Sequence, residues 1–158
     1  MNTIWAPWRM AYILSDKKTN ECVFCKAFNE KKDEENFVLF RSQYCFVIMN
    51  IYPYNPGHIM VVTNRHINHI KLLEEKESVD FFSTVRMFCN YLEMAFKPNG
   101  MNIGMNIGEA AGAGIEDHIH FHIVPRWVGD TNFMGTVCDT KVISESLRQT
   151  YNKIKELI

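Results

Sequence analysis

Three histidines alternate with apolar residues in one short segment, HIHFHIV, which runs from His118 to Val124. Successive side chains of a β-strand face opposite sides, so a strand here would place His118, His120 and His122 on one face. Neighbours on that face lie about 7 Å apart at a rise of roughly 3.3 Å per residue, so adjacent imidazoles can surround one substrate atom. The spacing therefore indicates a reaction centre.

Such a row of histidines is compatible with several roles. A solvent-facing strand would normally use Thr, Lys or Glu, and buried imidazoles are costly unless each has a partner. A three-histidine metal centre is a second interpretation, because zinc enzymes use such sets. In a third, a neutral imidazole attacks phosphorus and forms a phosphoramidate that a second nucleophile resolves. That nucleophile needs an acceptor for its other N–H, with flanking donors to phosphate oxygens, and the central His120 is best placed.

The segment before the histidines, NIGEAAGAGIED (Asn106 to Asp117), is rich in glycine and alanine. Small residues allow a phosphate to approach the backbone closely. The pattern is neither a Walker loop nor a dinucleotide fingerprint, and glycines also serve as ordinary turn residues. Its position beside the histidines is what makes it a candidate substrate loop.

Composition limits the class of protein. The chain has 158 residues, 47% hydrophobic and 22% charged, which is typical of one soluble globular domain. A net charge of −1 without a basic block argues against binding a nucleic acid polymer. No apolar run approaches the roughly 20 residues of a membrane helix, and the N-terminus lacks the apolar core of a signal peptide. We therefore expect a cytoplasmic protein that does not enter a membrane.

Hydrophobic periodicity predicts an α+β fold with a mostly antiparallel sheet. The first two strands have hairpin spacing, and the long helix carries a wide apolar stripe that predicts burial on two sides. We expect strands over 37–40, 44–50, 58–62, from 101 onward and over 118–124, with helices over 73–96 and about 143–158.

The five cysteines fall into two groups. Cys45, Cys89 and Cys138 occur singly in apolar segments and are expected to be small core residues in a reducing compartment. Cys22 and Cys25 form a C-x₂-C pair, which is compatible with a zinc site, a redox site or two packed thiols.

Taken together, these segments resemble the histidine triad (HIT) family of nucleotide hydrolases and transferases. HIHFHIV matches the family signature His-φ-His-φ-His-φ-φ, where φ is apolar. NPGHIMVV is similar to the family's PGH strand and NIGEAAGAG to its substrate loop. WAPWR, PRW and GDTNFM resemble the diadenosine tetraphosphate phosphorylase branch, so the resemblance covers nearly the whole chain.

The resemblance implies a single HIT domain over residues 1–158. In that fold a five-stranded antiparallel sheet is accompanied by a long central helix and a C-terminal helix. Two copies join as a homodimer with a ten-stranded sheet, and the long helix lies at the interface. The family uses nucleotide substrates and no organic cofactor.

The resemblance also implies an activity. His120 would attack the α-phosphate of a dinucleoside polyphosphate such as diadenosine tetraphosphate (Ap4A), giving a nucleotidyl-His120 intermediate. The branch motifs favour phosphate as the group that resolves it. One alternative is a nucleotide hydrolase or adenosine phosphoramidase that uses water. Another, of a different class, is a nucleotide-binding module with little turnover, although the intact triad argues against it.

Residue roles follow by position. His122 would donate to α-phosphate oxygens and support the leaving group, and Asn50 would bind ribose. In the loop, many relatives carry Gln followed by Ser or Thr where this chain has Ala113 and Gly114, so backbone amides must serve there. The expected catalytic residues are His118, His120 and His122. The expected substrate-binding residues are Asn50, His58, Asn106, Gly112, Ala113, Gly114 and Trp127.

Zinc-containing relatives complete their metal site with two histidines. By resemblance, the ligands here would be Cys22, Cys25, His66 and His118. This Cys₂His₂ set would make zinc a structural brace and not the catalyst. His69, three residues after His66, is the alternative to His66 as the third zinc ligand.

Overall fold

The computed structural model describes residues 21–131, 137 and 141–158 of the chain. The WAPWR motif, the last three residues of GDTNFM and Cys138 lie outside these residues. The elements, in chain order, are α2 (Val23–Glu30), β1 (Val38–Arg41), β2 (Cys45–Met49), β3 (Ile59–Thr63), the 3₁₀-helix η1 (Ile70–Leu72), α3 (Glu75–Phe96), β4 (Gly100–Gly104), the 3₁₀-helix η2 (Glu109–Ala111), β5 (His120–Arg126) and α5 (Leu147–Lys155).

The five strands form one antiparallel sheet in the order β1-β2-β3-β5-β4. The last strand therefore inserts between β3 and β4, where Val62 pairs with His120 and Met60 pairs with His122. Central strands are held on both edges, so the backbone that carries these two histidines is fixed by hydrogen bonds on each side. The predicted α+β class and antiparallel sheet are confirmed.

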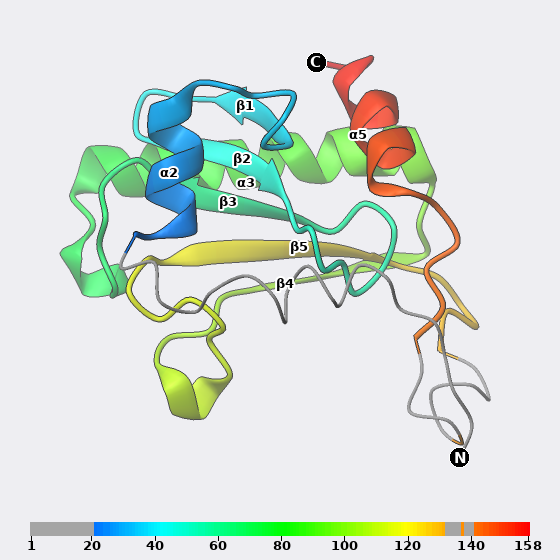
Figure 1. Cartoon of the computed structure of the whole chain (residues 1–158). Helices are drawn as coiled ribbons and strands as arrows, with labels where there is room; N and C mark the ends of the chain where they lie inside the picture. Colours follow the sequence, from blue (N-terminus) through cyan, green and yellow to red (C-terminus); the bar gives the residue numbers. More distant parts are fainter. Residues whose placement is uncertain (1–20, 132–136, 138–140) are drawn as a thin grey trace.

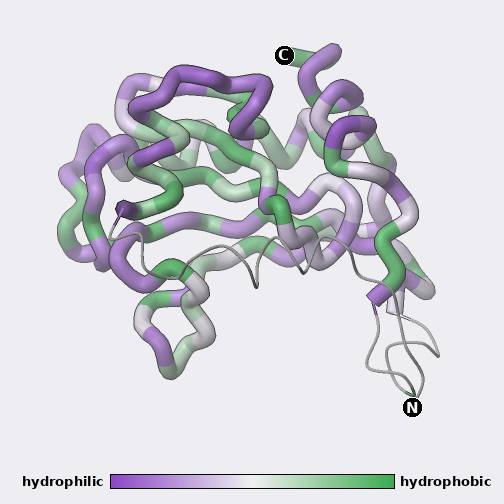
Figure 2. The backbone as a smooth tube through the Cα atoms, in the orientation of Figure 1, coloured by the Kyte–Doolittle hydropathy of each residue, from purple (hydrophilic) through white to green (hydrophobic). Residues whose placement is uncertain are grey.

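Two hydrophobic clusters lie on opposite faces of the sheet. On one face, Phe88 of α3 and Tyr151 of α5 pack against strand residues that include Ile123. On the other face, Phe24 of α2 packs against a smaller group that includes Val62. Figure 1 shows α2 in front of the sheet and α3 behind it, and Figure 2 shows the hydrophobic strands between hydrophilic loops. The burial of each such side chain stabilises the fold by roughly 1.5–3 kcal/mol.

Helix α3 begins at a capping box, in which the Glu74 and Glu77 side chains accept hydrogen bonds from each other's backbone N–H. It ends at Phe96, because Lys97 adopts the left-handed conformation with φ of 47° and Pro98 follows it. The predicted helix is therefore correct to within two residues at its start.

The prediction that helix α3 is buried on two sides is wrong for the single chain. Burial on two sides was expected, yet Val79, Phe82 and Met94 are each more than half exposed. The helix packs one side against the sheet, and the outer part of its wide apolar stripe faces solvent in the described part of the chain.

Among the described residues, none of the helices has the length and apolar composition that a membrane span requires.

The start of the histidine strand also differs from the prediction. β5 runs from His120 to Arg126 and includes Pro125, whereas the expected strand began at His118. The reason is that the Ile119 N–H bonds to the carbonyl of Ile67, in the loop after β3, and not to a sheet partner. His118 therefore precedes the strand.

Two helix boundaries also depart from the expected ones. The segment containing CVFC forms helix α2, which no periodic pattern had indicated. The C-terminal helix begins at Leu147, later than the expected start near 143, because the Ser146 side chain caps it by accepting a bond from the Gln149 N–H.

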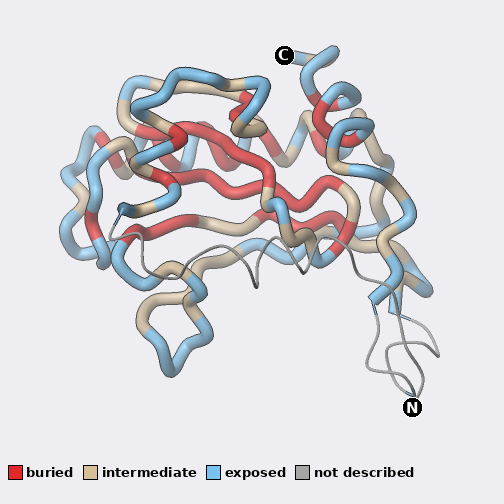
Figure 3. The backbone as a smooth tube through the Cα atoms, in the orientation of Figure 1, coloured by how far each residue is buried: buried red, intermediate tan, exposed pale blue. Residues whose placement is uncertain are grey.

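The outer strand β4 is largely exposed, in contrast to the buried strands beside it (Figure 3).

Candidate active site and metal cluster

His120 and His122 lie on the α2 face of the sheet, and Phe121 and Ile123 pack toward α3, as the alternation predicts. The two imidazole ring centroids are 4.9 Å apart. Phe24 of α2 lies 5.0 Å from the His120 ring, centroid to centroid. The strand thus presents two adjacent imidazoles beside an apolar wall.

The hydrogen bonds of His120 assign its tautomer. Its Nδ1 lies 2.9 Å from the carbonyl oxygen of His118, and a carbonyl can only accept. Nδ1 therefore carries the proton, which leaves the lone pair of a neutral imidazole on Nε2. This nitrogen makes no hydrogen bond to another described residue, so it is available to attack an electrophile.

His122 is held in the opposite tautomer by His58. The backbone N–H of Tyr54 donates to Nδ1 of His58 at 3.0 Å, so the proton of neutral His58 must be on Nε2. That N–H points at Nδ1 of His122, 2.9 Å away. His122 then accepts at Nδ1 and carries its own proton on Nε2, which makes it a donor.

Burial keeps these imidazoles neutral. It lowers the pKa of His58 to about 3, and the charges of His122 and His120 act in the same direction. It also lowers the pKa of His122 to about 4, with a contribution from His120. For His120, burial lowers the pKa while the bond to the His118 carbonyl opposes the change. At neutral pH the pair therefore combines an unprotonated nitrogen on His120 with a neutral N–H donor on His122.

The four predicted metal ligands come together at the other end of this face. The ligand atoms of Cys22, Cys25, His66 and His118 all lie within 4.8 Å of one another. Nδ1 of His118 is 3.3 Å from Sγ of Cys22 and 3.6 Å from Sγ of Cys25, and Nδ1 of His66 is 3.2 Å from Sγ of Cys25. Sulfur and nitrogen ligands of one tetrahedral zinc ion would be about 3.5 Å apart. The donor set and its spacing therefore fit such a metal.

The tautomer of His118 suits it to coordination. Its Nε2 donates to the carbonyl oxygen of Thr63 at 2.8 Å, so the lone pair lies on Nδ1, which faces the two cysteines. His69 is not part of the cluster, because its Nδ1 accepts a bond from the Lys71 N–H at the start of η1. Of the two alternatives, His66 is the one that the fold brings to the cysteines.

The other predicted substrate-binding residues do not all make contacts with the histidines. Asn50 follows β2 and lies beside His58, with its Nδ2 3.4 Å from Nε2 of His58. Asn106 donates to the carbonyl of Gly112 at 3.3 Å, which closes the glycine loop on itself. Ala113 and Gly114 belong to the same loop, and the hydrogen bonds of its described residues stay within it. The structure therefore places Asn50 beside His58, whereas the hydrogen bonds of the glycine loop close it on itself and do not join it to the histidines.

Trp127 lies beyond the end of β5. At roughly 3.3 Å per residue, it is about 16 Å along the chain from His122. Its backbone N–H donates to the Asp130 carboxylate at 3.1 Å, in the turn that follows the strand. The strand therefore does not carry Trp127 to the two catalytic candidates.

Two neighbours of the histidines were missed by sequence reasoning. Phe24 contacts both His118 and His120, and Tyr54 stacks at 4.6 Å from His58, centroid to centroid. Each had a signal in the sequence: Phe24 lies between the paired cysteines, and Tyr54 immediately precedes the NPGH segment. Neither signal is sufficient by itself, because each contact depends on how distant segments pack.

Comparison with known proteins gives matches over most of the chain. The sequence model of one protein family, described as HIT domain, matches residues 31–128. The AP-4-A phosphorylase of Mycobacterium tuberculosis is 33% identical over 157 residues, which cover 95% of this chain and 80% of the relative. A bis(5'-adenosyl)-triphosphatase of Saccharomyces cerevisiae is 31% identical over 98 residues, covering 59% of this chain and 47% of the relative.

Solved structures share the same fold. A zinc-bound histidine triad family protein from Mycobacterium smegmatis superimposes with a TM-score of 0.70 at 21% sequence identity. The match covers 86% of this chain and 91% of that one. The arrangement of sheet and helices is therefore that of an already known architecture.

Proposed function

This chain belongs to the HIT domain family, and on that premise we propose that it cleaves dinucleoside polyphosphates such as Ap4A through a nucleotidyl-histidine intermediate. The names of its relatives support this substrate class, since one is an AP-4-A phosphorylase and another a bis(5'-adenosyl)-triphosphatase. The proposed catalytic residues are His120 and His122, with His118 as a structural partner.

In the first step, Nε2 of His120 attacks the α-phosphorus. A P–N bond forms, and the bond from that phosphorus to the bridging oxygen breaks. The oxygen leaves with the electron pair on the released nucleotide, and the Nε2–H of His122 supports it by hydrogen bonding as its charge develops. Asn50 is proposed to hold the ribose beside His58, and the backbone of Gly112, Ala113 and Gly114 to approach the phosphates.

In the second step, an oxygen of inorganic phosphate attacks the same phosphorus. The P–N bond breaks, its electron pair returns to Nε2 of His120, and ADP is released. With Ap4A as substrate the products are ATP and ADP. Water in place of phosphate would give ATP and AMP, which is the alternative for a hydrolase.

The opposite tautomers of His120 and His122 are the observation that carries this proposal. A nucleophile needs a free lone pair, and a group that stabilises departing charge needs a proton. The backbone carbonyl of His118 and the side chain of His58 favour one of these states on each ring. A module that only bound nucleotides would not need this division.

We also propose that the metal of the cluster is zinc. Two thiols and two imidazole nitrogens are a typical structural zinc set, and a neighbour of the same fold is described as zinc-bound. When bound, zinc would tie α2 and the loop after β3 to the start of the histidine strand. Cys22, Cys25, His66 and His118 would hold it without taking part in the reaction.

A homodimer is proposed from two exposed surfaces. Val79, Phe82 and Met94 are exposed on α3, and β4 has an outer edge without a partner strand among the described elements. A second copy could cover both. The cytoplasm is the proposed location because the thiols of the described cysteines are free, as a reducing compartment would keep them.

A product assay tests the reaction. The purified protein is incubated with labelled Ap4A, with and without inorganic phosphate, and the nucleotides are separated. Phosphorolysis predicts ADP together with ATP, and only when phosphate is present. Release of AMP at the same rate without phosphate would show that water is the acceptor, and no turnover would favour a binding module.

A further inference from the structure

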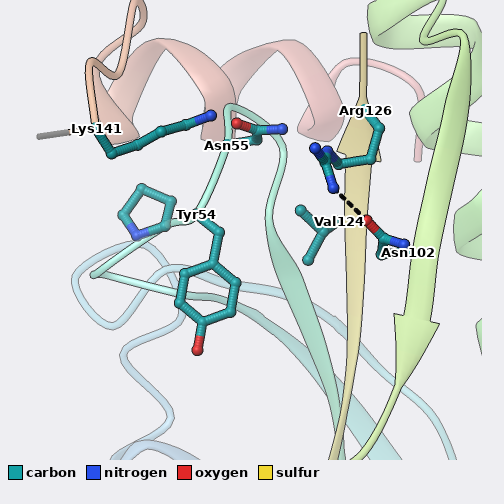
Figure 4. Close-up of a pocket in the computed structure, with 7 residues that line it drawn as sticks. Tyr54, Asn55, Asn102, Val124, Arg126 and Lys141 are labelled. Carbon is teal, nitrogen blue, oxygen red and sulfur yellow. Dashed lines mark hydrogen bonds between the residues drawn. The ribbon is translucent and has the colours of Figure 1, made fainter. Parts of the chain in front are cut away.

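A cavity of about 400 Å³ lies on the histidine face of the sheet, beyond His122. Strand β5, strand β4 and the segment before β3 form its walls (Figure 4). It is lined by Pro53, Tyr54, Asn55, Asn102, Val124, Arg126 and Lys141. A volume of this size is within the range of small-molecule sites.

The cavity adjoins the candidate active site. Val124 and Arg126 follow His122 at alternate positions of β5, so all three side chains face the same way. Tyr54 belongs to both places, because it lines the cavity and its ring centroid is 6.1 Å from that of His122. A molecule bound at His122 that extends along β5 would therefore enter the cavity.

Arg126 is fixed in position with donors to spare. Its Nε and Nη2 donate to the Asp130 carboxylate at 2.6 and 2.8 Å, and its Nη1 donates to Oδ1 of Asn102 at 2.6 Å. A guanidinium has five N–H donors, so this network leaves two of them for a ligand. The Asp130 carboxylate, whose pKa the Arg126 bond lowers, offsets the charge of Arg126.

Lys141 supplies the charge that is not offset. Its Nζ donates to the backbone carbonyl of Asp130 at 2.6 Å, and no ion pair joins it to a carboxylate among the described residues. An ammonium group has three donors, so two remain. The cavity therefore combines Lys141, Arg126 and the amide of Asn102 around one space, which is a set of groups suited to phosphate oxygens.

We infer that this cavity binds the distal phosphates of the leaving nucleotide. The inference rests on the proposed function, because it assigns a place to the part of Ap4A that departs from His120. The first phosphate of the leaving group would lie at His122, and those further along the chain would reach Lys141 and Arg126. Lys141 is then a residue that selects long polyphosphate bridges.

A pair of substrates tests this assignment. Ap4A carries distal phosphates, whereas adenosine 5'-phosphoramidate releases only ammonia and cannot occupy the cavity. We expect Lys141→Met to lower kcat/KM for Ap4A by about tenfold or more, the size of a lost charged hydrogen bond, and to leave the phosphoramidate rate unchanged. Equal rates on Ap4A before and after the substitution, or an equal loss on both substrates, would overturn the inference.

Lys155→Met is the matched control. Its Nζ also donates to a backbone carbonyl, that of Leu39 at 2.8 Å, but it lies on α5 on the opposite face of the sheet. The substitution removes the same charge and the same kind of bond, so it should leave both rates at the wild-type value. A loss on Ap4A equal to that of Lys141→Met would mean that net charge is responsible and would overturn the inference.

A binding measurement separates this inference from the proposed function. Inorganic tripolyphosphate is titrated into the wild-type protein and both lysine variants by calorimetry. Weaker binding to Lys141→Met alone supports the cavity as a phosphate site even if wild-type protein does not cleave Ap4A, which would refute only the proposed function. Equal binding to all three proteins, or none to the wild type, would overturn the inference.

Discussion

The two ends of the histidine segment use the same residue type for opposite purposes. At His118 the free lone pair on Nδ1 faces two cysteines, whose Sγ atoms lie 3.3 and 3.6 Å away. At His120 the free lone pair makes no hydrogen bond to another described residue, and at His122 the second ring nitrogen carries an N–H. One end has the donor set and spacing of a closed metal site, and the other leaves an unbonded nitrogen and an N–H, as the proposed reaction requires.

The contrast between these histidines indicates that the hydrogen-bond partner of one ring nitrogen determines what the other ring nitrogen can do. Backbone carbonyls accept from Nε2 of His118 and from Nδ1 of His120, so the lone pair falls on a different atom in each ring. His122 instead accepts from His58. Sequence alternation gives the three side chains one face, and these partners give them separate chemistry.

The largest expected effect comes from removing the nucleophile. His120→Asn should lower turnover of Ap4A by at least about 10³-fold, because no other described side chain offers an equivalent nitrogen at that position. Nucleotide binding, measured by calorimetry, should remain within a few-fold of wild type. Turnover near the wild-type rate would remove His120 from the mechanism.

Removing a thiol tests the proposed metal site at the His118 end of the histidine segment. Cys22→Ser should release the metal, seen by elemental analysis, and lower the melting temperature by about 5 °C or more, since metal binding contributes to folding. Cys89→Ser is the control, because this thiol lies outside the cluster and should leave the metal content unchanged. Equal metal content in both variants would contradict the assignment.

The partner of His122 can be changed without touching His122. His58→Leu should lower kcat by about 10- to 100-fold, because His122 loses the donor that fixes its tautomer. His58→Gln keeps an N–H near the same place and should recover part of the loss. If both variants had the same rate, burial and not the hydrogen bond would account for the role of His58.

The smallest expected effect is on stability at mild acidity. His58 and His122 have folded-state pKa values of about 3 and about 4, below the ordinary value of 6.5. Between these values and 6.5 the unfolded chain binds more protons, so stability should fall as pH falls through this window. The slope is at most about 1.4 kcal/mol per pH unit for each imidazole, and less for the partly exposed His122. Urea unfolding at pH 7 and pH 5 would measure it, and a His58→Gln variant should show a shallower fall.

Much of this arrangement could be predicted from the sequence. The alternation in HIHFHIV places His120 and His122 on one face, and the order of strand and helix patterns gives the α+β class. The C-x₂-C pair indicated a metal site among other uses, and the resemblance to a family identified His66 and His118 as its partners. These features are local or are carried by motifs.

The rest depends on contacts between distant segments. Nothing near Tyr54 in the sequence indicates that its N–H fixes the proton of His58. The early end of strand pairing at His118 follows from a bond to Ile67, and no local pattern records that bond. The cavity joins β4, β5 and Lys141, whose proximity exists only after folding.

The bond from His120 to the carbonyl of His118 gives the proposed nucleophile a form of mutational robustness. The acceptor belongs to the peptide backbone, so replacing the side chain at position 118 removes a metal ligand without deleting the acceptor. Alanine scanning would therefore not reveal this contact. Only chemical editing of the main chain, such as a change of the carbonyl acceptor by semisynthesis, or a shift of the local chain path would expose it.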